Sequence, residues 1–338
     1  MSPSLFLLLS FGGVLSLKIC SFNIQSFGES KVSKPVVLNI ILEHIQASWL
    51  LYAMYQAKAT EKSITRCDLM LVMEIKDAKG TAFPQLMTHL NNRYRGRRPE
   101  YGHVISQRLG RKSYKEQYAF IYRQKLVSLK SVYQYPDIQS EDTDAFAREP
   151  FVVWFSSPTT EIKDFVIIPI HTTPDAAVKE IDELYDVYQD VAQKWQSKNF
   201  IIMGDFNAAC GYVPKKDWPN IRLRSTASFF WITGDDLDTS VKESTKCAYD
   251  RVVLHGEKII QAIRPESVEV YNFKQAFGLT EQQVEDASSA LFGEAVVEGL
   301  LSCGLTGCMR GTSLREHFAG ARASPSFSGC GTTGGRMI

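Results

Sequence analysis

The sequence lacks the features that would place it in several common classes of protein. Its 38 Lys and Arg residues nearly balance 37 Asp and Glu residues, and the net charge of +1 gives no overall attraction to nucleic acid. None of the seven cysteines has the C-x-x-C spacing of a zinc site, and no N-x-[ST] glycosylation acceptor occurs. No segment after Leu17 is apolar and long enough to span a membrane. Any basic binding surface must therefore be local.

The chain begins with an apolar run, MSPSLFLLLSFGGVLSL, which has small residues near Ser16. This run predicts a secretory signal peptide over residues 1–16, although no Lys or Arg precedes it; the alternative is a buried first strand. We therefore expect secretion through the endoplasmic reticulum, where some of the cysteines would form disulfides. The residues alone leave their pairing open.

Segments dominated by Val, Ile, Leu and Phe alternate along the chain with segments of helical periodicity. The clearest helix is predicted for 176–198, where apolar residues recur every three or four positions behind Thr172-Thr173-Pro174. Continuous apolar character is typical of strands buried on both faces, and strands alternating with helices predict an α/β layered domain. The predicted strands are Lys18–Asn23, Leu69–Ile75, Gln117–Arg123, Phe151–Phe155, Phe165–His171 and Phe200–Asn207.

Two regions do not follow this pattern. Residues 45–65 continue a helical pattern beyond what a connection to the next strand needs, which indicates an insertion. From Ala287 onward the chain is rich in Gly, Ser, Ala and Cys and has little sustained periodicity. We expect 287–338 to be a largely disordered tail with a short helix near Gly293–Leu301.

Polar side chains occur at or near the ends of four predicted strands, namely Asn23, Glu74, His171, and Asp205 with Asn207. In α/β sheets, ligand-binding and catalytic groups gather at the carboxyl ends of strands, where loops converge. Carboxylate and amide oxygens suit Mg²⁺, Mn²⁺ or Ca²⁺ better than zinc, and such a cation serves phosphate-ester chemistry. The imidazole adds a group for proton transfer.

Seven local motifs occur in order along the chain: SFNIQSFGES (21–30), LVMEIKD (71–77), RLGRKSYKEQYAF (108–120), FAREPFVVWF (146–155), IPIHTTP (168–174), MGDFNAAC (203–210) and CAYDRVV (247–253). Together they resemble the deoxyribonuclease I family, within the endonuclease/exonuclease/phosphatase superfamily. The resemblance covers 17–286, apart from 45–65. It implies a two-sheet α/β sandwich with flanking helices.

The resemblance also implies roles for the acidic and histidine residues. Glu116 and His171 would be an acid–base pair at the scissile phosphate, with the carboxylate orienting the imidazole. Asp250 would orient a further catalytic group. Glu74 would hold the catalytic Mg²⁺ or Mn²⁺, and Ca²⁺ would be a structural or activating ion. The remaining residues of the metal and phosphate environment would be Asn23, Asp205 and Asn207.

Further residues match the family at the DNA-binding surface and in the scaffold. Arg148, Arg111 and Tyr114 would contact the DNA backbone. The alternative interpretation is a solvated surface charge for Arg111 and a loop cap for Arg148. Cys210 and Cys247 match the structural disulfide of the family, which would stabilise the fold by about 3–4 kcal/mol on the chain-entropy model.

The sequence departs from the family after residue 286. The family pattern there is Ser-Asp-His followed by a final apolar strand, and this Asp–His pair supplies a second catalytic imidazole. Here Ser289 and Ala290 stand where the Asp and His would be. We expect this loss to lower activity by orders of magnitude. We also expect the missing strand to expose a sheet edge and weaken the fold.

These observations predict a secreted endodeoxyribonuclease that leaves 3′-hydroxyl and 5′-phosphate ends with little sequence preference, and whose activity is impaired. Its partner would be double-stranded DNA, including chromatin, and the chain would be a monomer; a nuclear location is the alternative to secretion. Two other functions stay open. One is a catalytically silent DNA- or partner-binding relative, and the other is a different phosphoesterase of the superfamily, such as a sphingomyelinase or an inositol phosphatase.

Overall fold

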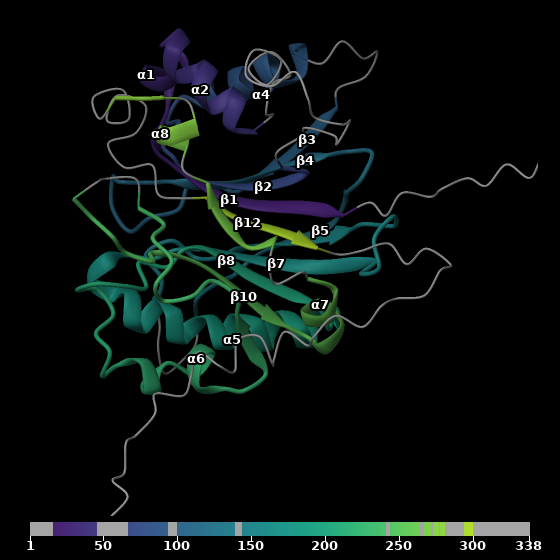
Figure 1. Ribbon diagram of the computed structural model, residues 1–338, viewed down its shortest axis with the longest axis vertical. Helices are drawn as coiled ribbons and strands as arrows, with labels where there is room; N and C mark the ends of the chain where they lie inside the picture. The colour runs from purple at the N-terminus through teal and green to yellow at the C-terminus, as the bar shows by residue number, and fades with distance from the viewer. Residues whose placement is uncertain are drawn as a thin grey trace, which may run out of the picture.

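The computed structural model describes residues 16–45, 67–93, 100–138, 144–240, 244–263, 267–271, 273–276, 278–280 and 294–299. Apart from Ser16 and Ile45, the predicted signal peptide and the insertion over 45–65 lie outside these ranges, as does most of the tail over 287–338. In the described part, the strands form two six-stranded sheets stacked between outer layers of helices (Figure 1). This layered arrangement confirms the two-sheet α/β sandwich predicted from the sequence.

Each sheet contains one pair of parallel strands, β1 with β2 and β7 with β8, and the other pairings are antiparallel. In spatial order, the first sheet comprises β11 (Glu269–Tyr271), β12 (Glu294–Gly299), β1 (Leu17–Phe27), β2 (Leu69–Ile75), β4 (Gln117–Arg123) and β3 (Tyr101–Ile105). The second comprises β5 (Ser128–Gln134), β6 (Phe151–Ser156), β7 (Asp164–His171), β8 (Phe200–Asp205), β10 (Asp250–His255) and β9 (Phe229–Trp231).

Helices cover the outer face of each sheet (Figure 1). The first sheet carries α1 (Glu29–Val32), α2 (Pro35–Ile45) and α4 (Ala82–Asn92), and the second carries α5 (Ala177–Trp195) and α6 (Arg222–Ser225). Two further short helices are α7 (Glu257–Ala262) and α8 (Phe273–Ala276). Among the described residues, none of these helices has the length and apolar character needed to cross a lipid bilayer.

Apolar side chains fill the space between the sheets as well as the space under the helices. Strand β2 is buried at every residue, which explains why its sequence shows no alternation. The six predicted strands are confirmed as β1, β2, β4, β6, β7 and β8, and the predicted helix over 176–198 is confirmed as α5. The edge strands β3 and β5 escape prediction because they are partly exposed and mix polar with apolar residues.

The C-terminal part of the first sheet differs from the prediction. The short helix expected near residues 293–301 is wrong, because Glu294–Gly299 forms strand β12. β12 pairs with β1 on one side and with β11 on the other, so this edge of β1 is paired rather than exposed. The two adjacent valines favour a strand, whereas Glu and Ala favour a helix, so pairing with β1 and β11 decides the outcome.

Candidate active site at the strand ends

The polar strand ends meet at one end of the sandwich. The parallel register of β7 and β8 places His171 opposite Asp205, and the antiparallel β10 places Asp250 on the other side of Asp205. From the first sheet, the Asn23 amide donates to Glu74 Oε1 at 3.2 Å and to Asp205 Oδ2 at 3.3 Å. One side chain of β1 therefore joins the two sheets at this point.

A cavity of about 630 Å³ opens at this meeting point. Its volume is within the range typical of small-molecule sites. The loops after the strands bring basic and aromatic side chains to the same cavity. The polar and aromatic residues that line it include Glu74, His171, Asp205, Asn207, Arg111, Lys112, Tyr114, Arg148, Tyr212 and Tyr249.

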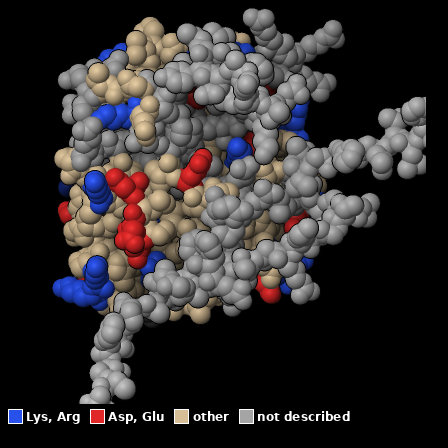
Figure 2. All heavy atoms as spheres, viewed as in Figure 1, with Lys and Arg blue, Asp and Glu red and all other residues tan. Residues whose placement is uncertain are grey.

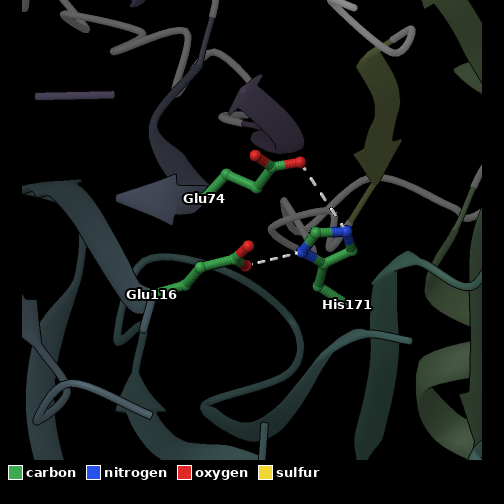
Figure 3. Close-up of side chains that lie close together, drawn as sticks. All are labelled: Glu74, Glu116 and His171. Carbon is green, nitrogen blue, oxygen red and sulfur yellow. Dashed lines mark hydrogen bonds and ion pairs between the residues drawn. The ribbon is translucent and has the colours of Figure 1, made fainter. Parts of the chain in front are cut away.

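His171 lies between two carboxylates in this cavity (Figure 3). Its Nδ1 is 2.9 Å from Oε2 of Glu116, and its Nε2 is 3.8 Å from Oε1 of Glu74. Asp205 Oδ2 is also 3.8 Å from Nε2. The imidazole thus bridges Glu116 to the cluster of Glu74 and Asp205.

The Glu116–His171 pair favours its ionised form. Burial and the charge of Arg148 oppose a proton on His171, but the hydrogen bond and the charge of Glu116 outweigh them. They raise the pKa of His171, with help from Asp205. Burial likewise opposes ionisation of Glu116, yet the hydrogen bond and charge of His171, followed by the charge of Arg148, lower the pKa of Glu116 to about 2. The carboxylate therefore holds the imidazolium and leaves Nε2–H directed at the cavity.

The backbone of His171 is also fixed. The Arg148 guanidinium donates from Nε at 2.9 Å and from Nη2 at 2.7 Å to the His171 carbonyl. The N–H of His171 donates to the Tyr118 hydroxyl at 2.9 Å. Arg148 and Tyr118 are both buried, so these contacts form in a region of low dielectric where hydrogen bonds are strong.

Glu74 is positioned by a bulge in β1. The register between β1 and β2 shifts between Asn23 and Phe27, and the intervening Gln25 and Ser26 have positive φ angles of 21° and 53°. This conformation directs the Ser26 N–H to Glu74 Oε2 at 2.9 Å. Glu74 itself has a φ of 56°. Positive φ at several non-glycine residues is typical of functional sites, where surrounding contacts maintain the strain.

The donor atoms suit a hard divalent cation. Among the described residues, Glu74, Glu116 and His171 form a cluster whose ligand atoms lie within 4.8 Å of one another. Because Glu116 is engaged with His171, the carboxylates of Glu74 and Asp205 are the better ligands. The Asn23 amide is hydrogen-bonded to both carboxylates, and a cation bound beside them would offset their combined negative charge. In this structure Asn23 donates its nitrogen to both carboxylates and its Oδ1 accepts from the Gln25 N–H, so it orients these ligands, and its place in the metal environment stays a prediction.

Asn207 completes the end of β8. Its backbone N–H donates to Asp205 Oδ1 at 3.0 Å, and its Nδ2 donates to the Thr172 carbonyl at 3.1 Å. Burial raises the pKa of Asp205, against the opposing effects of His171, Asn207 and Asn23. The side-chain oxygen of Asn207 is therefore the remaining oxygen donor at this strand end.

Asp250 stands apart from this network. It is fully buried, and neither carboxylate oxygen has a hydrogen-bond partner among the described residues. Burial and then the neighbouring charge of Asp205 raise the pKa of Asp250 well above its usual value. Buried carboxylates without a donor are rare because the desolvated charge is uncompensated. The structure therefore contains a carboxylate suited to a donor that the described residues do not supply.

The three predicted DNA-contacting residues line the cavity at different depths. The Tyr114 side chain is half exposed, and Arg111 pairs with Asp144 at 3.1 Å while remaining partly exposed. Arg148 is buried beneath them and holds His171. On the face seen in Figure 2, basic and acidic side chains are interspersed, so the positive groups in the cavity are local, as expected from the net charge.

Several residues near the site have no obvious signal in the sequence. The Lys76 ammonium lies 2.7 Å from Ser26 Oγ, 3.7 Å from Glu74 Oε2 and 3.9 Å from the centre of the Tyr114 ring. Tyr212 and Tyr249 pack against each other with ring centres 5.7 Å apart and line the cavity. Their roles follow only from tertiary contacts, although Lys76 lies within the motif LVMEIKD that contains Glu74.

Two disulfides brace the sandwich. The expected pair Cys210–Cys247 is present, and a second bond joins Cys20 to Cys67. The second pair links β1 to the residues just before β2. The sequence shows only that one cysteine lies within one predicted strand and the other just before a second predicted strand. That these strands pair in parallel, which brings the cysteines together, is known only from the structure.

Comparison with known proteins agrees with this architecture. The model of the "Endonuclease/Exonuclease/phosphatase family" matches residues 20–269. Deoxyribonuclease gamma from Homo sapiens is 52% identical over 85% of this chain and 88% of its own length. Deoxyribonuclease-1 from Equus caballus is 42% identical over 81% of this chain and 89% of its own.

Solved structures share the fold at much lower sequence identity. An endonuclease/exonuclease/phosphatase from Bacteroides vulgatus has a TM-score of 0.53 and 12% identity, covering 84% of this chain and 99% of its own. D. rerio TDP2 complexed with a single-strand DNA product has a TM-score of 0.51 and 12% identity, covering 83% and 98%. At this identity the likeness supports the sandwich architecture alone.

Proposed function

This chain belongs to the endonuclease/exonuclease/phosphatase family, and we propose that it is a deoxyribonuclease that hydrolyses internal phosphodiester bonds of double-stranded DNA with little sequence preference. The observation that carries the proposal is the buried Glu116–His171 pair beside the carboxylates of Glu74 and Asp205 in one cavity. The identity to curated deoxyribonucleases over most of the chain supports DNA as the substrate.

Glu74, Asp205 and Asn207 would hold a divalent cation, Mg²⁺ or Mn²⁺. When bound, such a cation polarises a phosphoryl oxygen and offsets the charge that develops on it. Ser26 and Asn23 fix the two carboxylates in advance, which reduces the reorganisation needed on binding. We assign Ca²⁺ a structural or activating role, as the family resemblance implies, and do not assign its ligands.

His171 has the chemistry of a general acid. Water attacks phosphorus, the bond from phosphorus to the 3′ oxygen breaks, and Nε2 of His171 donates its proton to that leaving oxygen. The products are a 3′-hydroxyl and a 5′-phosphate. Glu116 stabilises the imidazolium before transfer, while Arg148 holds the backbone that carries the ring. A pKa raised above its usual value suits proton donation near neutral pH.

We propose that the chain lacks the complementary base and has impaired activity. Asp250 is a buried carboxylate without a donor among the described residues, and Ser289 and Ala290 stand where the family has its second Asp–His pair. With the acid present and the base absent, deprotonation of the attacking water depends on solvent. Removal of one member of a catalytic unit typically lowers the rate by orders of magnitude.

We further propose that the protein is secreted through the endoplasmic reticulum and acts as a monomer on DNA, including chromatin. The apolar first residues support secretion, and the two disulfides suit an oxidising compartment. A nuclear location is the alternative. One observation favours an alternative function: among the described residues, the Asp250 carboxylate has no hydrogen-bond partner. The alternative is a catalytically silent relative that binds DNA or another protein.

Plasmid nicking by chain 17–338 in Mg²⁺ and Ca²⁺ tests the proposal. It is compared with Ser289→Asp/Ala290→His and with the same double variant carrying His171→Gln. We expect weak nicking by the parent, a gain of at least about a hundredfold in the restored chain, and loss of that gain without His171. Binding of DNA by both chains with cleavage by neither would support the silent relative. A restored chain that hydrolyses other phosphate esters but not DNA would contradict the substrate.

A further inference from the structure

One buried carboxylate close to the active site is not used in the mechanism above. Glu180 is in the first turn of α5 and has no exposed surface. Its Oε1 accepts a hydrogen bond from the Thr173 N–H at 3.1 Å, and its Oε2 has no hydrogen-bond partner among the described residues. Thr173 is the N-cap residue of a 3₁₀ helix, Pro174–Ala176, that runs into α5 at Ala177, so the bond ties α5 to the start of this helical segment, in the turn directly after β7.

This turn carries the catalytic histidine. Residues 171–173 offer three consecutive backbone N–H groups, and each is bound by a different element of the fold. The acceptors are the Tyr118 hydroxyl at 2.9 Å, the Asp205 carbonyl at 3.0 Å and the Glu180 carboxylate at 3.1 Å. The third acceptor alone is a charged group, and charge-assisted hydrogen bonds are stronger than neutral ones.

Glu180 also acts on the other side of His171 through charge. Arg148, whose guanidinium binds the His171 carbonyl, is attracted by Glu116 at 3.6 Å and by Glu180. Glu116 contacts the guanidinium directly, and the charge of Glu180 adds a longer-range attraction in the same low-dielectric region.

We propose that Glu180 is a positioning residue for His171, acting through the Thr173 N–H and through Arg148. It touches neither the cation ligands nor the cavity, so it is not a catalytic residue. Its effect is to keep the His171 ring in the orientation in which Nδ1 faces Glu116 and Nε2 faces the cavity. A displacement of about 1 Å at a reacting group can lower a rate about a hundredfold, so such a remote contact has catalytic consequences.

The proposal rests on the proposed function only for its kinetic consequence, so the test begins with a signal that needs no activity. The Nδ1–H proton of His171, hydrogen-bonded to Glu116, is followed by NMR in the full chain and assigned by its loss in His171→Gln. Deuterium exchange of the Thr173 amide is measured in parallel. The variants are Glu180→Ala, Glu180→Gln, which keeps an oxygen acceptor, and Glu183→Ala as a matched control.

Glu183 is a suitable control because it is a buried glutamate on the same helix that lies 3.9 Å from Arg222, away from the turn. We expect Glu180→Ala to broaden or abolish the Nδ1–H signal and to speed Thr173 exchange by at least about tenfold. Glu183→Ala should keep both, and Glu180→Gln, which keeps the acceptor but loses the charge, should show a smaller loss than Glu180→Ala. In nicking assays, Glu180→Ala should lower kcat by about tenfold or more with an unchanged KM.

An unchanged Nδ1–H signal and unchanged Thr173 exchange in Glu180→Ala would overturn the proposal. The proposal would also be overturned if Glu180→Ala and Glu183→Ala lost the Nδ1–H signal and the protection of Thr173 to the same extent. The two variants are compared under conditions in which urea unfolding shows the same fraction folded. If no chain nicks DNA while the NMR differences persist, the proposed function fails and the positioning role stands. The two conclusions are therefore tested separately.

Discussion

The Glu116–His171 pair predicts a specific dependence of stability on pH. Burial favours the protonated form of Glu116, but the hydrogen bond and charge of His171, together with the charge of Arg148, outweigh burial. They lower the pKa of Glu116 from 4.5 to about 2. A carboxylate whose pKa is lower in the folded state stabilises the fold at pH values above its unfolded pKa. That stabilisation is complete above about pH 4.5 and is lost as the pH falls through the folded pKa near 2.

The magnitude follows from the two pKa values. The difference between 4.5 and about 2 is about 2.5, and at about 1.36 kcal/mol for each pKa unit this gives about 3 kcal/mol. The Glu116 side chain is 3% exposed, so solvent does not screen the interaction appreciably. His171 has the opposite sign: its raised pKa stabilises the fold below about pH 6.5, and this contribution is lost as the pH rises through the folded pKa. The contribution of His171 to the free energy of unfolding is therefore constant between about pH 6 and about pH 2.

Urea unfolding followed by tryptophan fluorescence, from about pH 6 to about pH 2, measures this contribution. The free energy of unfolding of the parent should exceed that of Glu116→Gln most at pH 5–6, and the difference should shrink by about 3 kcal/mol at pH 2. Glu161→Gln, which changes an exposed carboxylate, should parallel the parent throughout. A difference between the parent and Glu116→Gln that stays constant with pH would refute the reasoning.

Three further predictions concern the strands around the site. Gly204→Ala should lower the free energy of unfolding, measured in urea, by at least about 2 kcal/mol. Gly204 has a φ of 139°, and a Cβ there would lie 2.1 Å from a backbone oxygen of β7. Gly211→Ala is the control and should be near neutral, because the space around its Cβ is open. Cys20→Ala/Cys67→Ala should lower it by about 4 kcal/mol, since the bond closes a loop over a separation of 47 residues. Added imidazole at constant pH should raise the nicking rate about tenfold by serving as the missing base, and Asp250→Asn should remove that gain.

The fold was predictable where burial imposes a continuous apolar pattern. β2 and β8 are buried at every residue and pair with neighbours on both sides, so their sequences identify them without reference to the rest of the chain. The strand-end residues were predictable for a related reason, because polar or charged side chains within apolar, buried strands are exceptional. β5 is an exposed edge strand whose sequence, SLKSVYQ, resembles that of a loop.

The orientation of side chains at the site was not predictable in this way. The sequence places Asn23 in the metal environment, but the hydrogen bonds by which its amide nitrogen joins Glu74 to Asp205 depend on how the two sheets stack. Glu180 belongs to the apolar-periodic helix α5, and its contact with Thr173 depends on the path of the turn between β7 and α5. Such contacts between distant elements leave no local pattern in the sequence.

The strongest link between fold and function is the row formed by His171, Asp205 and Asp250 across three neighbouring strands. Opposed like charges on adjacent strands destabilise a sheet. At Asp205 the charge is compensated by Asn23, Asn207 and His171. At Asp250 burial and then the charge of Asp205 raise the pKa well above its usual value, and the opposing effects of Thr239 and Arg251 do not offset them. Among the described residues, neither carboxylate oxygen of Asp250 accepts a hydrogen bond, which supports the proposal that a proton-carrying group belongs beside it. A group restored there should raise stability and activity together.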